Sequence, residues 1–477
     1  MSGLIKRLRE IVGSEACLTR PGELLVYECD GLTLESRLPF AVVLPENTEQ
    51  VVQVVQACRE AGHPIVPRGA GTGLSGGAHP VEGAVLVECS RMNRILEVDV
   101  ENRFAVIQPG LVNAELSRAV AQHGLFYAPD PSSQQACTIG GNVAENSGGP
   151  HTLKYGTTTD HILGLEMVLP DGERMRFGSA AGRRGFDLVG VIVGSEGTLG
   201  IVTEMTVRLV AQPESVETLL AIFEDTVSAC RAVGRIIGGG LVPAALEIVD
   251  QRTIAAVEDS VYAAGLPRDA GAILIAEVDG AACSLVREVE KIREYAQAEG
   301  ARGVEVARDE EERARFWRAR KGAFGAMGRL APDLYVHDAV VPRAKLPEVL
   351  EKVCAIGDRY GLTLSNVFHA GDGNLHPNIS FDRCDPDEVT RVKAAGREIL
   401  ETCVAAGGVI TGEHGVGVEK RDYLKLVFED EDLLPMLHVR DAFDPERMCN
   451  PTKIFPTTRF CFESNPHARG YDRVRFE

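Results

Sequence analysis

The chain has 477 residues, enough for about three domains of ordinary size. Its 44% hydrophobic and 25% charged residues are typical of a globular protein and exclude a disordered chain. The net charge of −19 makes nucleic acid and anionic lipid surfaces poor partners. An anionic substrate stays compatible with this charge, because one arginine or a metal ion can outweigh the overall field locally.

The sequence lacks targeting segments and cysteine-based metal motifs. No apolar stretch reaches the roughly 18 residues of a membrane span, and the basic first ten residues are not followed by the apolar region of a signal peptide. The twelve cysteines are scattered without a CxxC pair, which excludes an iron–sulfur run or a zinc ribbon in this sequence. We therefore expect a cytoplasmic protein with reduced thiols and no transmembrane segment.

The first half of the chain predicts an α+β domain. A short helix over 4–11 and a connector occupy residues 1–38. Alternating elements follow, with strands over 41–44, 64–67, 84–88, 103–108, 164–169 and 200–209 and helices over 47–62 and 113–123. A polar, glycine-rich passage fills 129–159, and the domain spans 39–213.

The second half predicts a ferredoxin-like α+β domain over 214–456, followed by a tail at 457–477. Its predicted strands are 217–223, 244–249, 271–277, 335–341, 363–369 and 375–381. Its predicted helices include 226–237, 281–299, 389–406 and 433–442, the last two being C-terminal. The sequence contains no internal repeat and no long linker.

One glycine-rich segment, Gly71-Thr72-Gly73-Leu74-Ser75-Gly76, matches the dinucleotide pattern GxGxxG. In that pattern the last glycine opens a helix, but here Pro80, Gly83 and a strand follow. We therefore expect a nest instead, in which successive glycines turn backbone N–H groups toward one anion. An ordinary glycine-rich turn is the alternative on this motif alone.

Two further segments favour a ligand site. Residues 130–149 offer hydroxyls, small side chains and glycines over some twenty positions, which suits a flat ligand that hydrogen-bonds to the main chain. A loop of this length inside a compact domain is usually functional. A third glycine cluster at 194–200 precedes the strand over 200–209.

In this order and spacing, the three segments resemble the FAD-binding domain of the vanillyl-alcohol-oxidase (PCMH-type) flavoprotein family, over about 39–208. The resemblance implies two α/β subdomains, with the pyrophosphate at the first loop, the isoalloxazine at the second and the adenine near the third. The implied FAD-binding residues are Arg68, Gly69, Ala70, Gly71, Thr72, Gly73, Leu74, Ser75, Gly76, Pro131, Ser132, Ser133, Thr138, Gly140, Gly141, Asn142, Ser147, Gly148, Ile201 and Val202. Some relatives bind FAD covalently through a first-loop histidine; Gly71-Thr72 stand there, so we expect non-covalent FAD.

The run His369-Ala-Gly-Asp-Gly-Asn-Leu-His376 predicts two strands joined by a tight turn. Opposed side chains on such strands lie about 5 Å apart, close enough for two imidazoles to share a metal ion. Two strand-end histidines bonded to backbone are the alternative. Glu413-His414, between glycines, adds a carboxylate and a third imidazole and favours the functional interpretation.

Residues 217–456 resemble the C-terminal domain of FAD-linked 2-hydroxy-acid dehydrogenases, which include D-lactate dehydrogenases, D-2-hydroxyglutarate dehydrogenase and the FAD-linked subunit of glycolate oxidase. The runs 316–321 and 332–342 are most similar to the glycolate oxidase branch. The resemblance implies that His369, His376 and Glu413 ligate a divalent metal, Zn with Mn or Fe as alternatives. It also implies His414 as general base, with Arg320 and Asn378 binding the substrate while hydride passes to flavin N5.

The same resemblance implies partners and a substrate class. Members that use dicarboxylates carry a lysine where this chain has Val336, so we expect a monocarboxylate such as glycolate or D-lactate. Electrons would pass to a second FAD-domain subunit and an iron–sulfur subunit, or to a quinone or cytochrome, rather than to NAD. Those partners could place the protein peripherally at the inner membrane. The alternatives are a stand-alone D-lactate or D-2-hydroxyglutarate dehydrogenase, a metal-dependent hydrolase and a non-catalytic flavoprotein subunit.

Overall fold

The computed structural model describes residues 3–183 and 185–456. It contains two compact units. Among the described residues, unit 1 comprises 3–148, 157–183, 185–212 and 413–456, and unit 2 comprises 149–156 and 213–412. Residues 413–456, which the sequence places in the second domain, thus pack with unit 1, and the predicted tail at 457–477 lies outside the described residues.

The first sheet of unit 1 is mostly parallel and is covered on both faces. Its strands, in spatial order, are β1 (Cys17–Leu18), β2 (Ala41–Val43), β4 (Val85–Glu88) and β3 (Ile65–Arg68). Alternate residues of β2, β3 and β4 face α1 (Gly3–Val12) and α3 (Thr48–Ala61), and the others pack on Leu24 of α2 (Pro21–Leu24). Asn47 caps the start of α3 and Gly62 ends it in the left-handed conformation, as the sequence predicts.

The second sheet of unit 1 is antiparallel. Its strands, in spatial order, are β5 (Ile95–Asp99), β6 (Phe104–Ile107), β10 (Ile201–Arg208), β8 (Ile162–Val168) and β9 (Arg174–Gly178). Its core includes residues of α4 (Asn113–Val120) and α8 (Leu188–Ile192), and Phe443, the last residue of α15 (Asp430–Phe443), packs against it. A small ribbon pairs β7 (Leu125–Phe126) with β11 (Val210–Ala211). Strands β5 and β9 were not predicted, because their faces are largely exposed.

The glycine-rich passage over 129–159 is more ordered than its composition suggests. It contains α5 (Ile139–Glu145) and α6 (Thr152–Tyr155), and α7 (Thr158–His161) begins at its end. Helix α5 forms despite two glycines because the Thr138 side chain accepts a hydrogen bond from the Gly141 N–H and caps the first turn.

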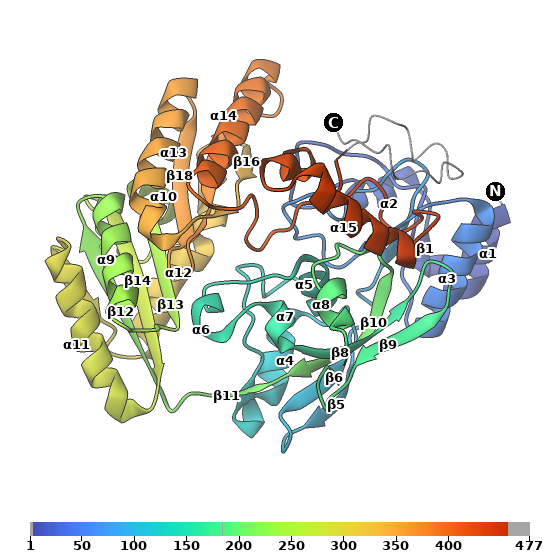
Figure 1. Cartoon of the computed structure of the whole chain (residues 1–477), viewed down its shortest axis with the longest axis horizontal. Coiled ribbons are helices and arrows are strands. Elements are labelled where there is room, and N and C mark those ends of the chain that lie inside the picture. The colour runs from blue at the N-terminus through green and yellow to red at the C-terminus, as the bar shows by residue number, and fades with distance from the viewer. Residues whose placement is uncertain (1–2, 184, 457–477) are drawn as a thin grey trace. The chain divides into compact units, whose positions relative to one another are not determined.

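Unit 2 contains the predicted ferredoxin-like arrangement. Strands β12 (Ser215–Phe223), β13 (Ala245–Asp250), β14 (Ala272–Gly280) and β15 (Gly303–Val306) lie in the order β15-β12-β14-β13, all antiparallel. Helices α9 (Thr226–Gly238) and α11 (Ala282–Ala298) follow β12 and β14 and pack side by side over these strands (Figure 1). This confirms the predicted fold of the second half.

The sheet of unit 2 continues beyond β13. The added strands are β18 (Thr363–His369), β19 (Asn374–Leu375), β17 (Ala339–Val340), β16 (Asp333–Val336) and β20 (Pro377–Phe381). Helices α10 (Gln251–Glu258) and α12 (Glu310–Met327) pack together in an apolar cluster with Val367 of β18, and α13 (Leu346–Tyr360) packs on α14 (Pro386–Ala405). Across the described residues, every helix is too short or too polar to cross a bilayer.

Candidate active site

The first glycine loop leaves β3 at Arg68 and reaches β4 without forming a helix. Gly71 and Gly76 have φ angles of 70° and 78°, which L-residues rarely adopt. The GxGxxG run therefore does not open a helix, in agreement with the interpretation that it is not a dinucleotide fingerprint.

The backbone of this loop has the properties of an anion nest. Within the described part of the chain, none of the N–H groups of residues 70–76 donates to an acceptor. The buried Ser75 Oγ also lacks a hydrogen-bond partner there. Residues 70–74 are exposed or partly exposed, so their N–H groups are accessible to a bound anion, whereas Ser75 and Gly76 are buried. The loop thus fits a pyrophosphate, as FAD would supply.

Side chains hold this loop in place. Arg68 is 8% exposed and donates from Nη1 to the Cys29 carbonyl at 2.9 Å. A Cβ at Gly71 would lie 2.1 Å from Arg68 Nη2, and one at Gly69 would lie 2.2 Å from Thr138 Oγ1. The first loop therefore packs directly on the cap of α5, and a larger residue at either glycine would displace the side chain that contacts it.

The second glycine segment packs through its backbone. Gly140 donates its N–H to the Pro109 carbonyl at 2.8 Å, and a Cβ there would lie 2.5 Å from Pro109 Cβ. Gly140 thus has a packing role in addition to its predicted place in the FAD set. Asn142 is buried within α5, and Ser147 accepts the Thr158 N–H at 3.1 Å through its carbonyl.

All the predicted FAD residues belong to unit 1. The three segments that carry most of them are brought together around α5 and β10, with Pro131, Ser132 and Ser133 in a turn before α5 and Gly148 just after it. Ile201, at the start of β10, differs from the other predicted FAD residues, because its side chain lies in the apolar core with Val168. Only its backbone, or its partly exposed neighbour Val202, could approach a ligand.

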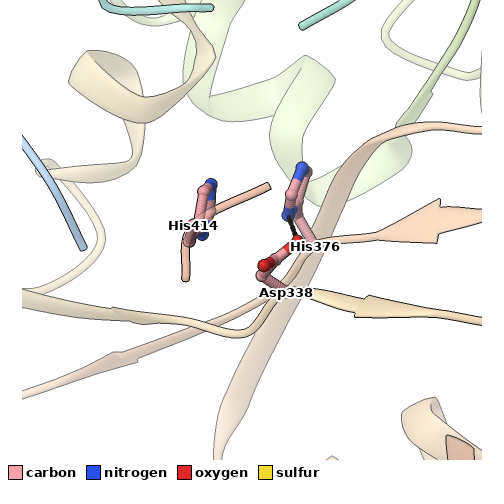
Figure 2. A group of neighbouring side chains, drawn as sticks. All are labelled: Asp338, His376 and His414. Atoms are coloured by element: carbon pink, nitrogen blue, oxygen red, sulfur yellow. Dashed lines mark ion pairs between the residues drawn. The ribbon is translucent and has the colours of Figure 1, made fainter. Parts of the chain in front are cut away.

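In unit 2, two adjacent stretches of the sheet are each broken into two short strands, and the two breaks lie opposite each other. Strand β16 pairs with β20 and β17 pairs with β19, so His337-Asp338 in one break lie opposite His376 in the other. His376 Nδ1 lies 3.2 Å from the His337 carbonyl and 3.9 Å from Asp338 Oδ1 (Figure 2). The predicted continuous strand over 335–341 is therefore wrong. At the break, the polar side chains of His337 and Asp338 are buried.

Asp338 also fixes the segment that leads out of unit 2. Its Oδ2 accepts from Thr411 Oγ1 at 2.6 Å and from the Gly412 N–H at 2.9 Å. The side chain is fully buried. Sequence reasoning did not identify Asp338 as a site residue, although its position between two strands beside a histidine is a usable signal.

The two predicted histidines meet as the hairpin pattern suggests. The ring centroids of His369 and His376 lie 5.2 Å apart, and a ring nitrogen of each lies within 4.8 Å of the other. His369 uses Nδ1 to contact Glu247 at 2.8 Å, and His376 uses Nδ1 to contact a backbone carbonyl. Metal-ligating histidines are oriented in this way, with the metal on Nε2.

Glu247 of β13 is a residue that sequence reasoning missed. It is fully buried opposite His369 in the sheet, and its Oε2 accepts from Arg320 Nε at 2.6 Å. Burial opposes its ionisation, but the charges of His369 and Arg320 outweigh burial and hold the pKa of Glu247 below its usual value. A lone glutamate in the apolar run 244–249 was the available signal.

Arg320 is not the exposed helix residue that a charged run would suggest. It lies on α12 with no exposed surface, its Nη2 is 3.5 Å from His369 Nδ1, and its Nη1 has no hydrogen-bond partner among the described residues. Asn378 Oδ1 is likewise buried without a partner there, while its Nδ2 donates to the His376 carbonyl at 2.7 Å. These two unsatisfied groups fit a small carboxylate ligand with a hydroxyl.

Glu413 and His414 begin the last segment of unit 1, directly after Gly412. Their side chains lie 3.6 Å apart, from His414 Nε2 to Glu413 Oε1, and both are mostly buried. Gly415 and Gly417 follow with φ angles of 82° and 54°.

Comparison with known proteins agrees with this geometry. Residues 212–454 match the model described as FAD linked oxidases, C-terminal domain, and residues 39–178 match the model described as FAD binding domain. The chain belongs to the FAD-linked oxidase family. The family models and the relatives described next together confirm the predicted resemblance to the glycolate oxidase branch, the α+β fold class and the class of FAD-dependent oxidoreductase.

Individual relatives cover nearly the whole chain. Over 97% of its length, it is 46% identical to the glycolate oxidase subunit GlcD of Escherichia coli (strain K12), of which it covers 93%. Over 90% of its length, it is 43% identical to GlcD of Bacillus subtilis (strain 168), of which it covers 92%. The D-lactate dehydrogenase of Archaeoglobus fulgidus is 33% identical over 87% of this chain, which covers 91% of that protein.

A solved structure extends the likeness in fold. Substrate-bound p-cresol methylhydroxylase superposes with a TM-score of 0.81 at 18% identity, covering 94% of this chain and 96% of that one.

Proposed function

We propose that this flavoprotein oxidises a small 2-hydroxy acid, glycolate or D-lactate, to the 2-oxo acid. The observation that carries the proposal is the buried group of Arg320, His369 and His376 in a chain whose relatives include glycolate oxidase subunits and D-lactate dehydrogenases. FAD, held non-covalently at the glycine loops, would accept the hydride from the substrate carbon.

Arg320 would bind the substrate carboxylate. Its Nε is already engaged by Glu247, so the contact would use the two Nη atoms. The Glu247 carboxylate holds the guanidinium in orientation, and Asn378 Oδ1 would accept a hydrogen bond from the substrate hydroxyl.

His369, His376 and Glu413 are our proposed ligands of a divalent ion, Zn, Mn or Fe. The use of Nδ1 by both histidines supports this set. Such an ion supplies Lewis-acid polarisation of the substrate hydroxyl. His414 would take the hydroxyl proton. The Gly412 N–H bond to Asp338 supports the assignment, because it holds the chain immediately before Glu413 beside His376 in unit 2.

The substrate would be a monocarboxylate. Val336, where a dicarboxylate-using enzyme would need a cation, ends β16 and is 5% exposed. A second carboxylate buried there would lose hydration without a positive charge to replace it.

Electrons would leave through partner proteins. Two relatives are named as subunits of glycolate oxidase, which supports the existence of partner subunits. As the acceptor we propose a second FAD-domain subunit and an iron–sulfur subunit, or a quinone or cytochrome, rather than NAD. The chain would then work in the cytoplasm, or at the inner membrane through these partners.

The decisive experiment is an anaerobic titration of the purified full-length chain with glycolate, D-lactate, L-lactate and D-2-hydroxyglutarate. Bleaching of the flavin band near ~450 nm by one acid reports hydride transfer and identifies the substrate. Bleaching by D-2-hydroxyglutarate alone would contradict the monocarboxylate assignment. A flavin spectrum that no acid bleaches would support the alternative of a non-catalytic flavoprotein subunit.

A stand-alone D-lactate dehydrogenase remains the second candidate, and the 33% identity to D-lactate dehydrogenases favours it over the others. It predicts bleaching by D-lactate and turnover with an artificial electron acceptor without any partner chain. The hydrolase alternative has no support among the relatives.

A further inference from the structure

Glu196 lies in the third glycine cluster, and the proposed chemistry does not use it. It is 4% exposed and has a φ of 51°, an unfavourable conformation for a residue with a Cβ. Its N–H donates to the Ala144 carbonyl at 2.8 Å, and its carbonyl accepts from Asn450 Nδ2 at 2.6 Å. Hydrogen bonds at both its N–H and its carbonyl therefore fix the backbone of Glu196. This fixed backbone limits the positions that the side chain can reach.

The Glu196 carboxylate binds two successive backbone N–H groups. Oε1 accepts from Val416 and Oε2 accepts from Gly417, both at 2.7 Å. Two short bonds from successive N–H groups hold this turn on one buried side chain. Burial raises the pKa of Glu196 to about 7, while the two bonds favour its charged form. A glutamine could accept only one of them, since its NH₂ group would face the second N–H.

The same turn is tied to the first glycine loop. The Ser75 carbonyl accepts from the N–H groups of Val418 and Glu419 at 3.0 and 3.1 Å. A Cβ at Gly417 would lie 2.1 Å from that carbonyl oxygen. Residues 416–419 are thus held between Glu196 on one side and the loop of the predicted pyrophosphate site on the other.

We propose that Glu196 is a positioning residue, which places His414 relative to the bound FAD by fixing the turn at 416–417 against the first glycine loop. The inference rests on the proposed function, in which His414 takes the substrate proton. Glu196 itself need not touch substrate or flavin. All the contacts that carry the inference lie within unit 1.

The test compares Glu196→Gln with wild type and with Glu204→Gln, a change to a partly exposed glutamate of β10 in the same unit. Hydrogen exchange of the full-length protein is measured on peptides that cover 413–420. We expect exchange at Val416 and Gly417 to rise about 10-fold in Glu196→Gln, because one of the two hydrogen bonds is lost. In Glu204→Gln we expect exchange at these residues to stay unchanged.

Stopped-flow reduction with glycolate supplies the second readout. We expect Glu196→Gln to retain bound FAD and the apparent glycolate Kd, which Arg320 would set, while its rate of flavin reduction falls about 10- to 100-fold. Glu196→Asp keeps two acceptor oxygens and should recover part of both the exchange protection and the rate. A purely structural role would instead lower FAD content and melting temperature in parallel with activity.

Two results would overturn the inference: unchanged exchange at 416–417 in Glu196→Gln, or a reduction rate that falls only in proportion to lost FAD. If Glu196→Gln does not fold, Glu196→Asp is judged by the same two readouts. A wild-type protein that no hydroxy acid bleaches would contradict the proposed function instead. In that case the exchange measurement alone still decides whether Glu196 fixes the turn.

Discussion

The candidate sites of the two units consist of different chemical groups. The cofactor cradle of unit 1 presents mainly backbone, with N–H groups over 70–76 that have no partner among the described residues and glycines that closely approach their neighbours. The site of unit 2 consists of buried side chains, in which Arg320, Glu247 and His369 contact one another with almost no exposed surface. A long cofactor needs many weak, well-placed donors, whereas a small acid needs a few strong charges. The first site should therefore be sensitive to added volume and the second to lost charge.

The largest effect should come from the proposed base. We expect His414→Ala to retain the yellow FAD colour but to slow flavin reduction by about 10²- to 10⁴-fold, because no other group is assigned to take the hydroxyl proton. Anaerobic stopped-flow reduction measures this rate. His123→Ala, at an exposed position of the same unit, serves as the matched control and should reduce at the wild-type rate. Unchanged reduction in His414→Ala would remove this residue from the mechanism.

The Glu247→Gln variant tests whether the stability of unit 2 depends on its buried charges. Glu247→Gln removes the carboxylate that neutralises buried Arg320, and breaking a buried ion pair costs about 3–5 kcal/mol of unfolding free energy. Urea unfolding followed by Trp317 fluorescence measures this, since the single tryptophan lies buried in unit 2. Glu348→Gln, in an exposed pair with Lys352, should change it by less than about 1 kcal/mol. Equal midpoints for the two variants would contradict a charge-based site.

Sequence reasoning succeeded where a local pattern determines the structure. The hairpin that joins His369 to His376 follows from its Gly-Asp-Gly-Asn turn, and the absence of a helix after Gly76 follows from Pro80 and Gly83. The ferredoxin-like order follows from the alternation of strands and helices. In the first two cases, the decisive residues lie within about ten positions of one another.

Sequence reasoning failed where the contacting residues are distant in sequence. Glu247 contacts Arg320 and His369, 73 and 122 residues away, and no local signal links them. The break between β16 and β17 is fixed by its neighbours β20 and β19, so the apolar run around it still predicts one strand. The return of residues 413–456 to unit 1 depends on contacts such as those of Glu196 with Val416 and Gly417.

The Gly71→Ala variant tests whether FAD binding by unit 1 is sensitive to added side-chain volume. An alanine there has an unfavourable φ of 70° and also places its Cβ 2.1 Å from Arg68 Nη2, so we expect FAD to bind more weakly by about 2 kcal/mol, near 30-fold. Gly124→Ala is the matched control, because its φ of 68° is the same but no atom lies within 4 Å. FAD titration by fluorescence compares them. Equal losses would mean that general destabilisation of unit 1, not the close contact at Gly71, lowers the affinity.

The smallest predicted effect concerns the packing of residues 149–156 within unit 2. Glu277 of β14 is 2% exposed and accepts from Trp317 Nε1 at 2.7 Å, with His151 Nε2 at 3.1 Å and Arg313 Nε at 3.1 Å. Burial alone would raise the pKa of Glu277, but the contacts with His151 and Arg313 prevail and hold it well below the usual value.

A carboxyl with a depressed folded-state pKa stabilises the protein at pH values above its unfolded pKa, near 4.3, and loses that contribution as the pH falls toward the folded value. Glu277→Gln cannot show this dependence. We therefore expect the gap in unfolding free energy between wild type and Glu277→Gln to narrow by about 0.6 kcal/mol between pH 7 and pH 4. Urea unfolding followed by circular dichroism at both pH values measures it. A gap that is constant with pH would show that neutral hydrogen bonds, rather than the charge of Glu277, fasten this segment.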